Sequence, residues 1–176
     1  MQRIIRETPM EFFRSLLGDA LQRERVKVAP ITEFYIVQLL AREVSDGHHP
    51  TEILADPFAG ALSASPRERV SALRSVGDRA LVFSGLWWER DSRPRRPAHV
   101  AYYVQLGSIA YRTIGGSPFE EMASKFEGIV DTLARVSTDV LVTSSSDILR
   151  IYCMWQETQS KFAARALAAR GVSVPT

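Results

Sequence analysis

The residues best suited to chemistry are an acid inside an apolar helical stretch and two tyrosines in a later one. Asp78 and Arg79 interrupt a run of apolar residues, and Tyr103 and Tyr111 lie eight positions apart, on nearly one helix face. A buried carboxylate and a buried phenol hydroxyl both need hydrogen-bond partners. We therefore expect Asp78 to bond an arginine or a tyrosine hydroxyl. The preferred interpretation is a polar network that fixes helix packing, and the alternative is a binding or catalytic carboxylate.

The same residues could also form a ligand pocket between three helices. That pocket would be lined by Asp78, Arg79, Tyr103, Tyr111 and Trp155. Aromatic walls with a few converging polar groups are typical of small-molecule sites.

A second candidate is the segment in which two tryptophans are followed by four arginines. Its members are Trp87, Trp88, Arg90, Arg93, Arg95 and Arg96. A solvated loop between helices is one interpretation of this charge run. Aromatic residues and arginine are also the usual anchors of protein interfaces, which indicates a contact surface. Phosphate contacts with bases stacked on the tryptophans are a further alternative.

The sequence contains no motif of catalysis, metal binding or cofactor binding. HExxH, ExxH, GxSxG, GxxxxGK[ST] and GxGxxG are all absent. His48 and His49 are adjacent in a Gly/Pro turn, and Cys153 is the single cysteine, so no set of metal ligands has a usual spacing. We expect no catalytic residues, no metal and no cofactor, and favour a protein that is not an enzyme.

Composition indicates one globular domain. The chain has 176 residues, 45% of them hydrophobic and 24% charged, with a net charge of +2. Among the basic residues, 19 are arginine and 3 are lysine, as a GC-rich genome would produce. Arginine selected for bidentate contacts with anions or carboxylates is the alternative. No signal peptide or membrane span is evident, and a single cysteine suits a reducing compartment, so we expect a cytoplasmic protein.

Helical periodicity predicts an all-α fold, a single-domain bundle of about six or seven helices with short connections. The expected helices begin near Pro9, Thr32, Thr51, Pro66, Ala98, Ser117 and Ser145 or Ser146. The fourth should run unbroken to Trp88 or Glu89, the sixth should run unbroken through Leu133, and the last should stop at Gly171. The domain spans 1–176, with 1–7 and 171–176 expected to be frayed.

Three glycines inside helical patterns indicate close helix packing. Gly77, Gly85 and Gly107 each cost about 1 kcal/mol relative to alanine in a helix. Close approach of the helices over 66–88 and 98–114 is the simplest compensation.

Three segments carry a resemblance to other proteins: GDRALVFSGLWW, AYYVQLGSIAYRTI and FEEMASKFEGIVDTLARVS. Together they resemble a group of uncharacterised bacterial all-helical proteins over about residues 30–170. The resemblance implies no activity and no cofactor.

We therefore expect a non-enzymatic cytoplasmic interaction or adaptor protein, whose partner is another protein or a second copy in a homodimer. A small-molecule-binding bundle with a Tyr/Trp-lined pocket is the alternative. Nucleic-acid binding through the arginine loop comes third, and no membrane partner is expected.

Overall fold

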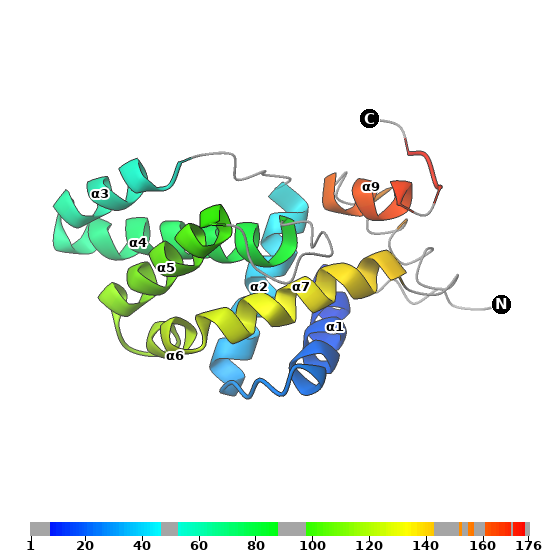
Figure 1. Ribbon diagram of the computed structural model, residues 1–176, viewed down its shortest axis with the longest axis horizontal. Coiled ribbons are helices and arrows are strands. Elements are labelled where there is room, and N and C mark those ends of the chain that lie inside the picture. Colours follow the sequence, from blue (N-terminus) through cyan, green and yellow to red (C-terminus); the bar gives the residue numbers. More distant parts are fainter. Residues whose placement is uncertain are drawn as a thin grey trace.

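A computed structural model of the chain describes residues 8–46, 53–87, 98–142, 152, 155–156, 161–169 and 171–174. Every regular element in these ranges is a helix, so the all-α prediction is confirmed (Figure 1). The elements are α1 (Pro9–Arg23), α2 (Pro30–Asp46), α3 (Ala55–Ser63), α4 (Pro66–Val82), the π-helical turn η1 (Phe83–Trp87), α5 (Ala98–Ile114), α6 (Phe119–Ser124), α7 (Phe126–Val142) and α9 (Lys161–Ala168). Within these ranges, no helix is both long enough and apolar enough to cross a lipid bilayer.

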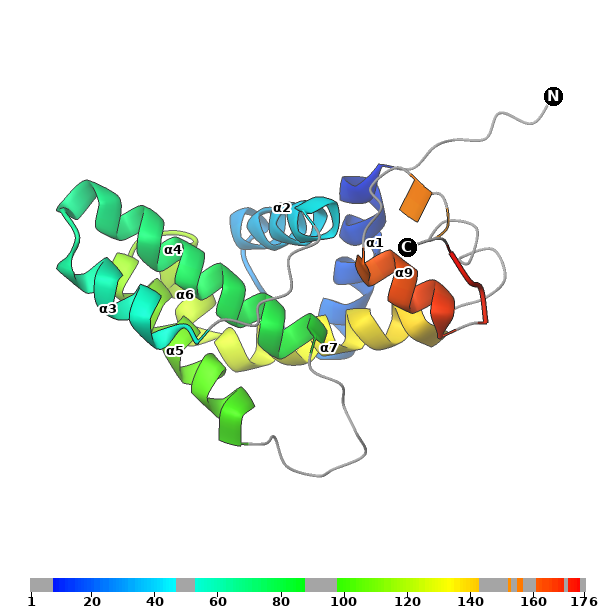
Figure 2. The same cartoon turned by 90° about the horizontal axis from the view of Figure 1, so that it is seen from above.

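The long helix α7 runs through the bundle and joins its two sides. It contacts α1 on one side and η1 and α5 on the other, while α9 lies against α2 and α7 (Figures 1 and 2). Helices α4 and α5 form the most extensive pair, and α3 packs on α4. Helix α2 contacts α1, α4, α6 and α9, so it is central.

The predicted start of the first helix and stop of the last are confirmed. The hydroxyl of Thr8 accepts a hydrogen bond from the amide of Glu11, and the Glu11 carboxylate accepts one from the amide of Thr8. At the other end of the chain, Gly171 has a φ of +74°. Its amide donates to Ala168, and that of Val172 donates to Leu167, which completes a glycine-terminated helix end. Val172 and Val174 then pack against the core, in a segment expected to be frayed.

The fourth helix does not continue as an α-helix to Trp88 or Glu89, because its last described turn is π-helical. The hydroxyl of Ser84 donates to the carbonyl of Ala80 at 2.7 Å, which competes with regular backbone pairing. Gly85 lies directly against α7, where an added Cβ would stand 2.5 Å from the Cβ of Leu133. The wider turn therefore brings bare backbone into contact with the neighbouring helix.

The predicted sixth helix is broken in two. The chain leaves the helical conformation at Lys125, which has φ −109° and ψ 16°, between α6 and α7. The hydroxyl of Ser124 donates to the carbonyl of Glu121 at 2.9 Å at this break. After the break, Phe126 is buried against Gly107 of α5. Tertiary contacts thus override the continuous periodicity of the sequence.

Two other starts differ by a few residues. Helix α2 begins at Pro30 rather than Thr32, and α3 begins at Ala55. Pro57 falls in the first turn of α3, where a missing amide hydrogen costs nothing, so the helix is not interrupted. The expected start of the last helix, Ser145 or Ser146, lies outside the described residues.

Close packing of α4 on α5 is confirmed at two of the three glycines. A Cβ on Gly107 would lie 2.8 Å from the Cβ of Ala80. A Cβ on Gly77 would lie 2.6 Å from Cδ1 of the Tyr111 ring. The missing side chain at Gly77 therefore makes room for Tyr111 beside Asp78.

Candidate functional site

A buried carboxylate on α4 organises the polar centre of the bundle. Asp78 is 4% exposed, and its Oδ1 accepts hydrogen bonds from the hydroxyls of Tyr35 at 2.6 Å and Tyr111 at 2.7 Å. Its Oδ2 accepts one from Nη2 of Arg42 at 2.8 Å. The prediction that Asp78 bonds an arginine or a tyrosine hydroxyl is therefore confirmed. We call Asp78, Tyr35, Tyr111, Arg42 and Arg74 the Asp78 cluster.

Arg74 joins this cluster through a tyrosine. Its Nε donates to the hydroxyl of Tyr35 at 2.8 Å and lies 4.0 Å from Oδ2 of Asp78. Its guanidinium carbon also stands 4.9 Å from the centre of the Tyr35 ring, in cation–π geometry. The hydroxyl of Tyr35 thus accepts from Arg74 while it donates to Asp78.

Spacing along two helices and one glycine place these groups. Tyr35 and Arg42 are seven residues apart on α2, which is two helical turns, and Arg74 and Asp78 are four apart on α4. Tyr111 reaches across from α5 over Gly77. Three helices therefore contribute to one carboxylate.

Burial and the negative charge of Asp78 keep the two phenols protonated. Burial, and then the charge of Asp78, raise the pKa of Tyr35 and of Tyr111 well above the usual value. Burial alone would lower the pKa of Arg42, but the hydrogen bond and charge of Asp78 outweigh it and raise that pKa. Both tyrosines therefore act as donors, and Arg42 stays charged.

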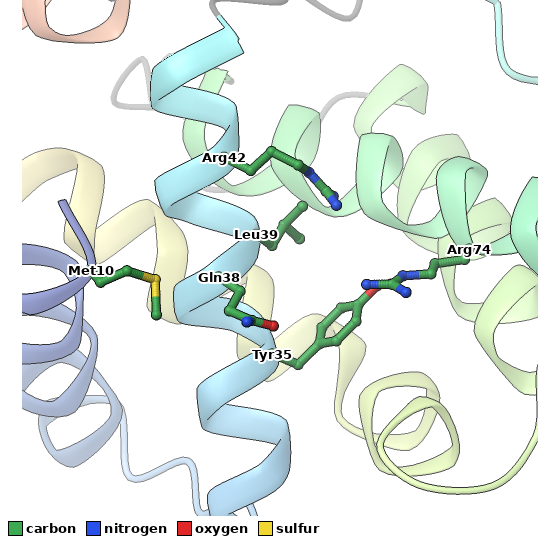
Figure 3. A pocket seen from close by; sticks show the side chains of 6 residues that line it. All are labelled: Met10, Tyr35, Gln38, Leu39, Arg42 and Arg74. Atoms are coloured by element: carbon green, nitrogen blue, oxygen red, sulfur yellow. The ribbon is translucent and has the colours of Figure 1, made fainter. Parts of the chain in front are cut away.

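A hollow of about 330 Å³ opens beside the Asp78 cluster. It is lined by Met10, Tyr35, Gln38, Leu39, Arg42 and Arg74 (Figure 3). It spans α2, with Met10 from α1 on one side and Arg74 from α4 on the other. The side chains of Arg42 and Arg74 are 47% and 45% exposed. Among the residues that the structure describes, its lining therefore contains two cations and no acid.

The structure divides the pocket residues predicted from the sequence. Asp78 and Tyr111 meet directly, but Arg79 is exposed, because successive helix residues point about 100° apart. The ring of Tyr103 packs on the ring of Phe83, with 4.2 Å between the two ring centres. Trp155 is buried, and its ring centre lies 5.8 Å from that of Tyr152. None of the five predicted residues lines the hollow of Figure 3, although Asp78 supports its wall.

The predicted contact surface falls almost wholly outside the described residues. Only the backbone of Trp87, the last residue of η1, is described. Trp88, Arg90, Arg93, Arg95 and Arg96 lie outside those ranges, as do His48, His49 and Cys153.

Sequence reasoning missed Tyr35, Arg42 and Arg74. Arg74 had a local signal, since it precedes Asp78 by four residues on the same helix. Tyr35 and Arg42 had a weaker one, because they share a helix face with Gln38, three residues after Tyr35 and four before Arg42. Nothing local indicates that this face of α2 meets Asp78.

A second carboxylate, Glu121, fastens α6 to the connection between α1 and α2. It accepts hydrogen bonds from the amide of Ala29 at 2.9 Å, the hydroxyl of Thr32 at 2.5 Å and Nζ of Lys125 at 2.7 Å. Lys125 also donates to the carbonyl of Lys27. The bond from Lys125, followed by that from Thr32, lowers the pKa of Glu121 to about 2. These five residues form the Glu121 cluster.

Over the part of the chain that the structure describes, no group of three His, Cys, Asp or Glu side chains could hold a metal ion. No protein-family model, curated protein or solved structure matches the chain. Functional proposals therefore rest on the geometry of the Asp78 cluster and its hollow.

Proposed function

We propose that the protein is a cytoplasmic, non-enzymatic binding protein that holds a small polar molecule in the hollow between α1, α2 and α4. One observation carries the proposal: two half-exposed arginines at the hollow are held in place by a buried carboxylate and a tyrosine. A volume of about 330 Å³ suits a small ligand. Met10 and Leu39 add apolar surface, while Gln38 and the arginines supply polar contacts.

The same geometry favours binding over proton transfer. Both oxygens of Asp78 already accept hydrogen bonds, and Asp78 does not line the hollow. Tyr35 does line it, but its raised pKa keeps the hydroxyl protonated. These groups are suited to fixing the arginines in position.

Methionine labelling tests this proposal directly. The chain has four methionines, of which Met10 lines the hollow and Met122 is fully buried in α6. In protein labelled with [13C-methyl]methionine, a library of small polar molecules should include compounds that shift the Met10 signal and leave that of Met122 in place. A Met10→Leu variant assigns the peak. If no compound shifts Met10, or if every shift is shared by Met122, the proposal is wrong.

As a second candidate we propose self-association through the tryptophan–arginine segment and α5. The supporting observation is that Tyr102 and Ile109 are 38% and 48% exposed. They lie seven residues apart, two helical turns, on the helix that follows that segment in the sequence, so they form one exposed apolar strip on α5. Sedimentation should then show a dimer that Trp88→Ala and Ile109→Ser weaken. A monomer at every concentration would contradict this candidate.

A further inference from the structure

We infer that the hollow selects ligands carrying a carboxylate or phosphate group, which Arg42 and Arg74 hold between them while Asp78 positions both arginines. The inference rests on the proposed function, because it names the chemical class of the molecule bound there. It follows from the charges, the unused donors and the size of the hollow.

Charge is the first argument. Arg42 and Arg74 both line the hollow, whereas the single negative charge they share, on Asp78, is buried in its wall. Glu43 adds negative potential at Arg42 but does not line the hollow. One positive charge therefore stays uncompensated within the cluster, and two like charges are held close together. An anion between them would relieve that repulsion.

Hydrogen-bond donors are the second argument. A guanidinium has five N–H donors in a rigid fork. Arg42 uses Nη2 toward Asp78, and Arg74 uses Nε toward Tyr35. Among the residues that the structure describes, their other nitrogens have no hydrogen-bond partner. Both guanidinium groups are already oriented, so they lose little freedom when they bind an oxyanion.

Figure 3 shows how the two side chains reach the hollow. Arg42 extends from α2 toward α4, and Arg74 extends from α4 toward the hydroxyl of Tyr35. Paired N–H groups from guanidinium forks match the oxygens of a carboxylate or phosphate. The Gln38 amide and the apolar Met10 and Leu39 remain for the rest of the ligand. Since a water molecule takes up about 30 Å³ in the liquid, the hollow has room for on the order of ten waters or a small ligand of similar volume.

Matched probes test the charge requirement. Benzoate and benzamide have the same shape and differ in charge, and phenyl phosphate distinguishes a preference for phosphate from one for carboxylate. In the [13C-methyl]methionine-labelled protein, benzoate or phenyl phosphate should shift Met10 at concentrations at which benzamide does not. Binding should weaken as NaCl is raised, since exposed charges are screened.

Variants then distinguish the two arginines that bind the anion from Tyr35, which orients Arg74. Arg42→Gln and Arg74→Gln should each raise the Kd for the anionic probe about tenfold or more. Tyr35→Phe removes the oxygen that accepts from Arg74 but keeps both charges, so it should lower the preference for benzoate over benzamide without abolishing binding. Arg67→Gln, at an exposed position of α4 outside the hollow, is the matched control. Thermal unfolding by circular dichroism confirms that each variant is folded.

The outcomes distinguish this inference from the proposed function. If benzamide binds as well as the anions, or if Arg42→Gln and Arg74→Gln bind them as wild type does, the inference is overturned. Met10 shifts caused by neutral compounds alone would overturn it while leaving the proposed binding function intact. If no molecule shifts Met10, both are wrong.

Discussion

The Asp78 and Glu121 clusters use the same chemistry for different ends. Each carboxylate accepts hydrogen bonds from three groups, including partners more than 30 residues away. The side chain of Asp78 is 6% exposed, and that of Glu121 is 24% exposed. The main difference lies in the cations. Lys125 donates hydrogen bonds to both Glu121 and Lys27. Arg42 and Arg74, in contrast, line a hollow and have further N–H groups there that can bind a ligand.

The partners of a carboxylate therefore decide whether its cluster only stabilises the fold or can also bind a ligand. Glu121 accepts from Ala29 just before α2 and from Thr32 in its first turn, so it acts as a cap supplied from α6. Asp78 joins α2, α4 and α5 and at the same time orients two arginines.

The largest expected effect distinguishes the two acids by burial. Asp78→Ala should lower the free energy of unfolding by about 3–5 kcal/mol, because it leaves two phenols and a guanidinium without their acceptor. Glu121→Ala should cost about 1–2 kcal/mol, because the Glu121 side chain is 24% exposed and water can take its place. Urea denaturation followed by circular dichroism measures both. Equal losses of unfolding free energy in the two variants would show that burial does not make Asp78 more important to stability than Glu121.

The next effect tests how Tyr111 reaches Asp78. Gly77→Ala places a methyl group against the Tyr111 ring and should cost about 1–3 kcal/mol of unfolding free energy through overpacking. Gly18→Ala in α1 is the matched control, since nothing lies within 4 Å of an added Cβ there. This control should stabilise the protein by up to about 1 kcal/mol. Destabilisation of similar size in both variants would contradict the proposed role of Gly77.

The Glu121 cluster should show its own pH dependence. Because the folded-state pKa of Glu121 is lowered from 4.5 to about 2, its contribution is full above pH 4.5 and is lost as the pH falls toward 2. Glu121→Gln should therefore cost about 1 kcal/mol at pH 7 and progressively less below pH 4.5. Unfolding curves of both proteins between pH 7 and pH 2 measure this difference. A constant difference would show that ionised Glu121 is not what fastens α2.

The variants with the smallest expected effects on stability, Arg74→Gln and Lys125→Gln, should differ most clearly in ligand binding. Arg74→Gln should change the free energy of unfolding by less than about 1 kcal/mol, because the side chain is 45% exposed, but it should weaken benzoate binding. Lys125→Gln should cost about 1 kcal/mol and leave benzoate binding unchanged. Chemical denaturation and Met10 titrations compare the two variants. Weaker binding in Lys125→Gln would show that the clusters are not independent.

Much of the fold could be predicted because it depends on nearest neighbours along the chain. The capping box at Thr8, the stop at Gly171 and the span of α5 all follow from interactions within about one helical turn. The sequence also indicated that Asp78 needs a partner, and that Gly77 and Gly107 allow close packing.

The break at Lys125 and the π-helical turn over Phe83–Trp87 could not be predicted in this way. At each position a serine hydroxyl bonds the preceding turn, Ser84 at the π-helical turn and Ser124 at the break. A distant segment also makes contact there, Leu133 at the turn and Lys27 at the break. The helical periodicity of the sequence continues through these positions, so the sequence pattern does not show where the α-helical conformation ends.

By itself, then, the sequence determined the helices, several of their ends and the need to neutralise Asp78. The tertiary structure alone decided that Tyr35 and Arg42 meet Asp78, 43 and 36 residues away along the chain, and that Arg74 rather than the adjacent Arg79 completes the cluster. The physical reason is range: capping and periodicity arise within a turn of helix, whereas the partners of a buried charge depend on which helix faces pack together.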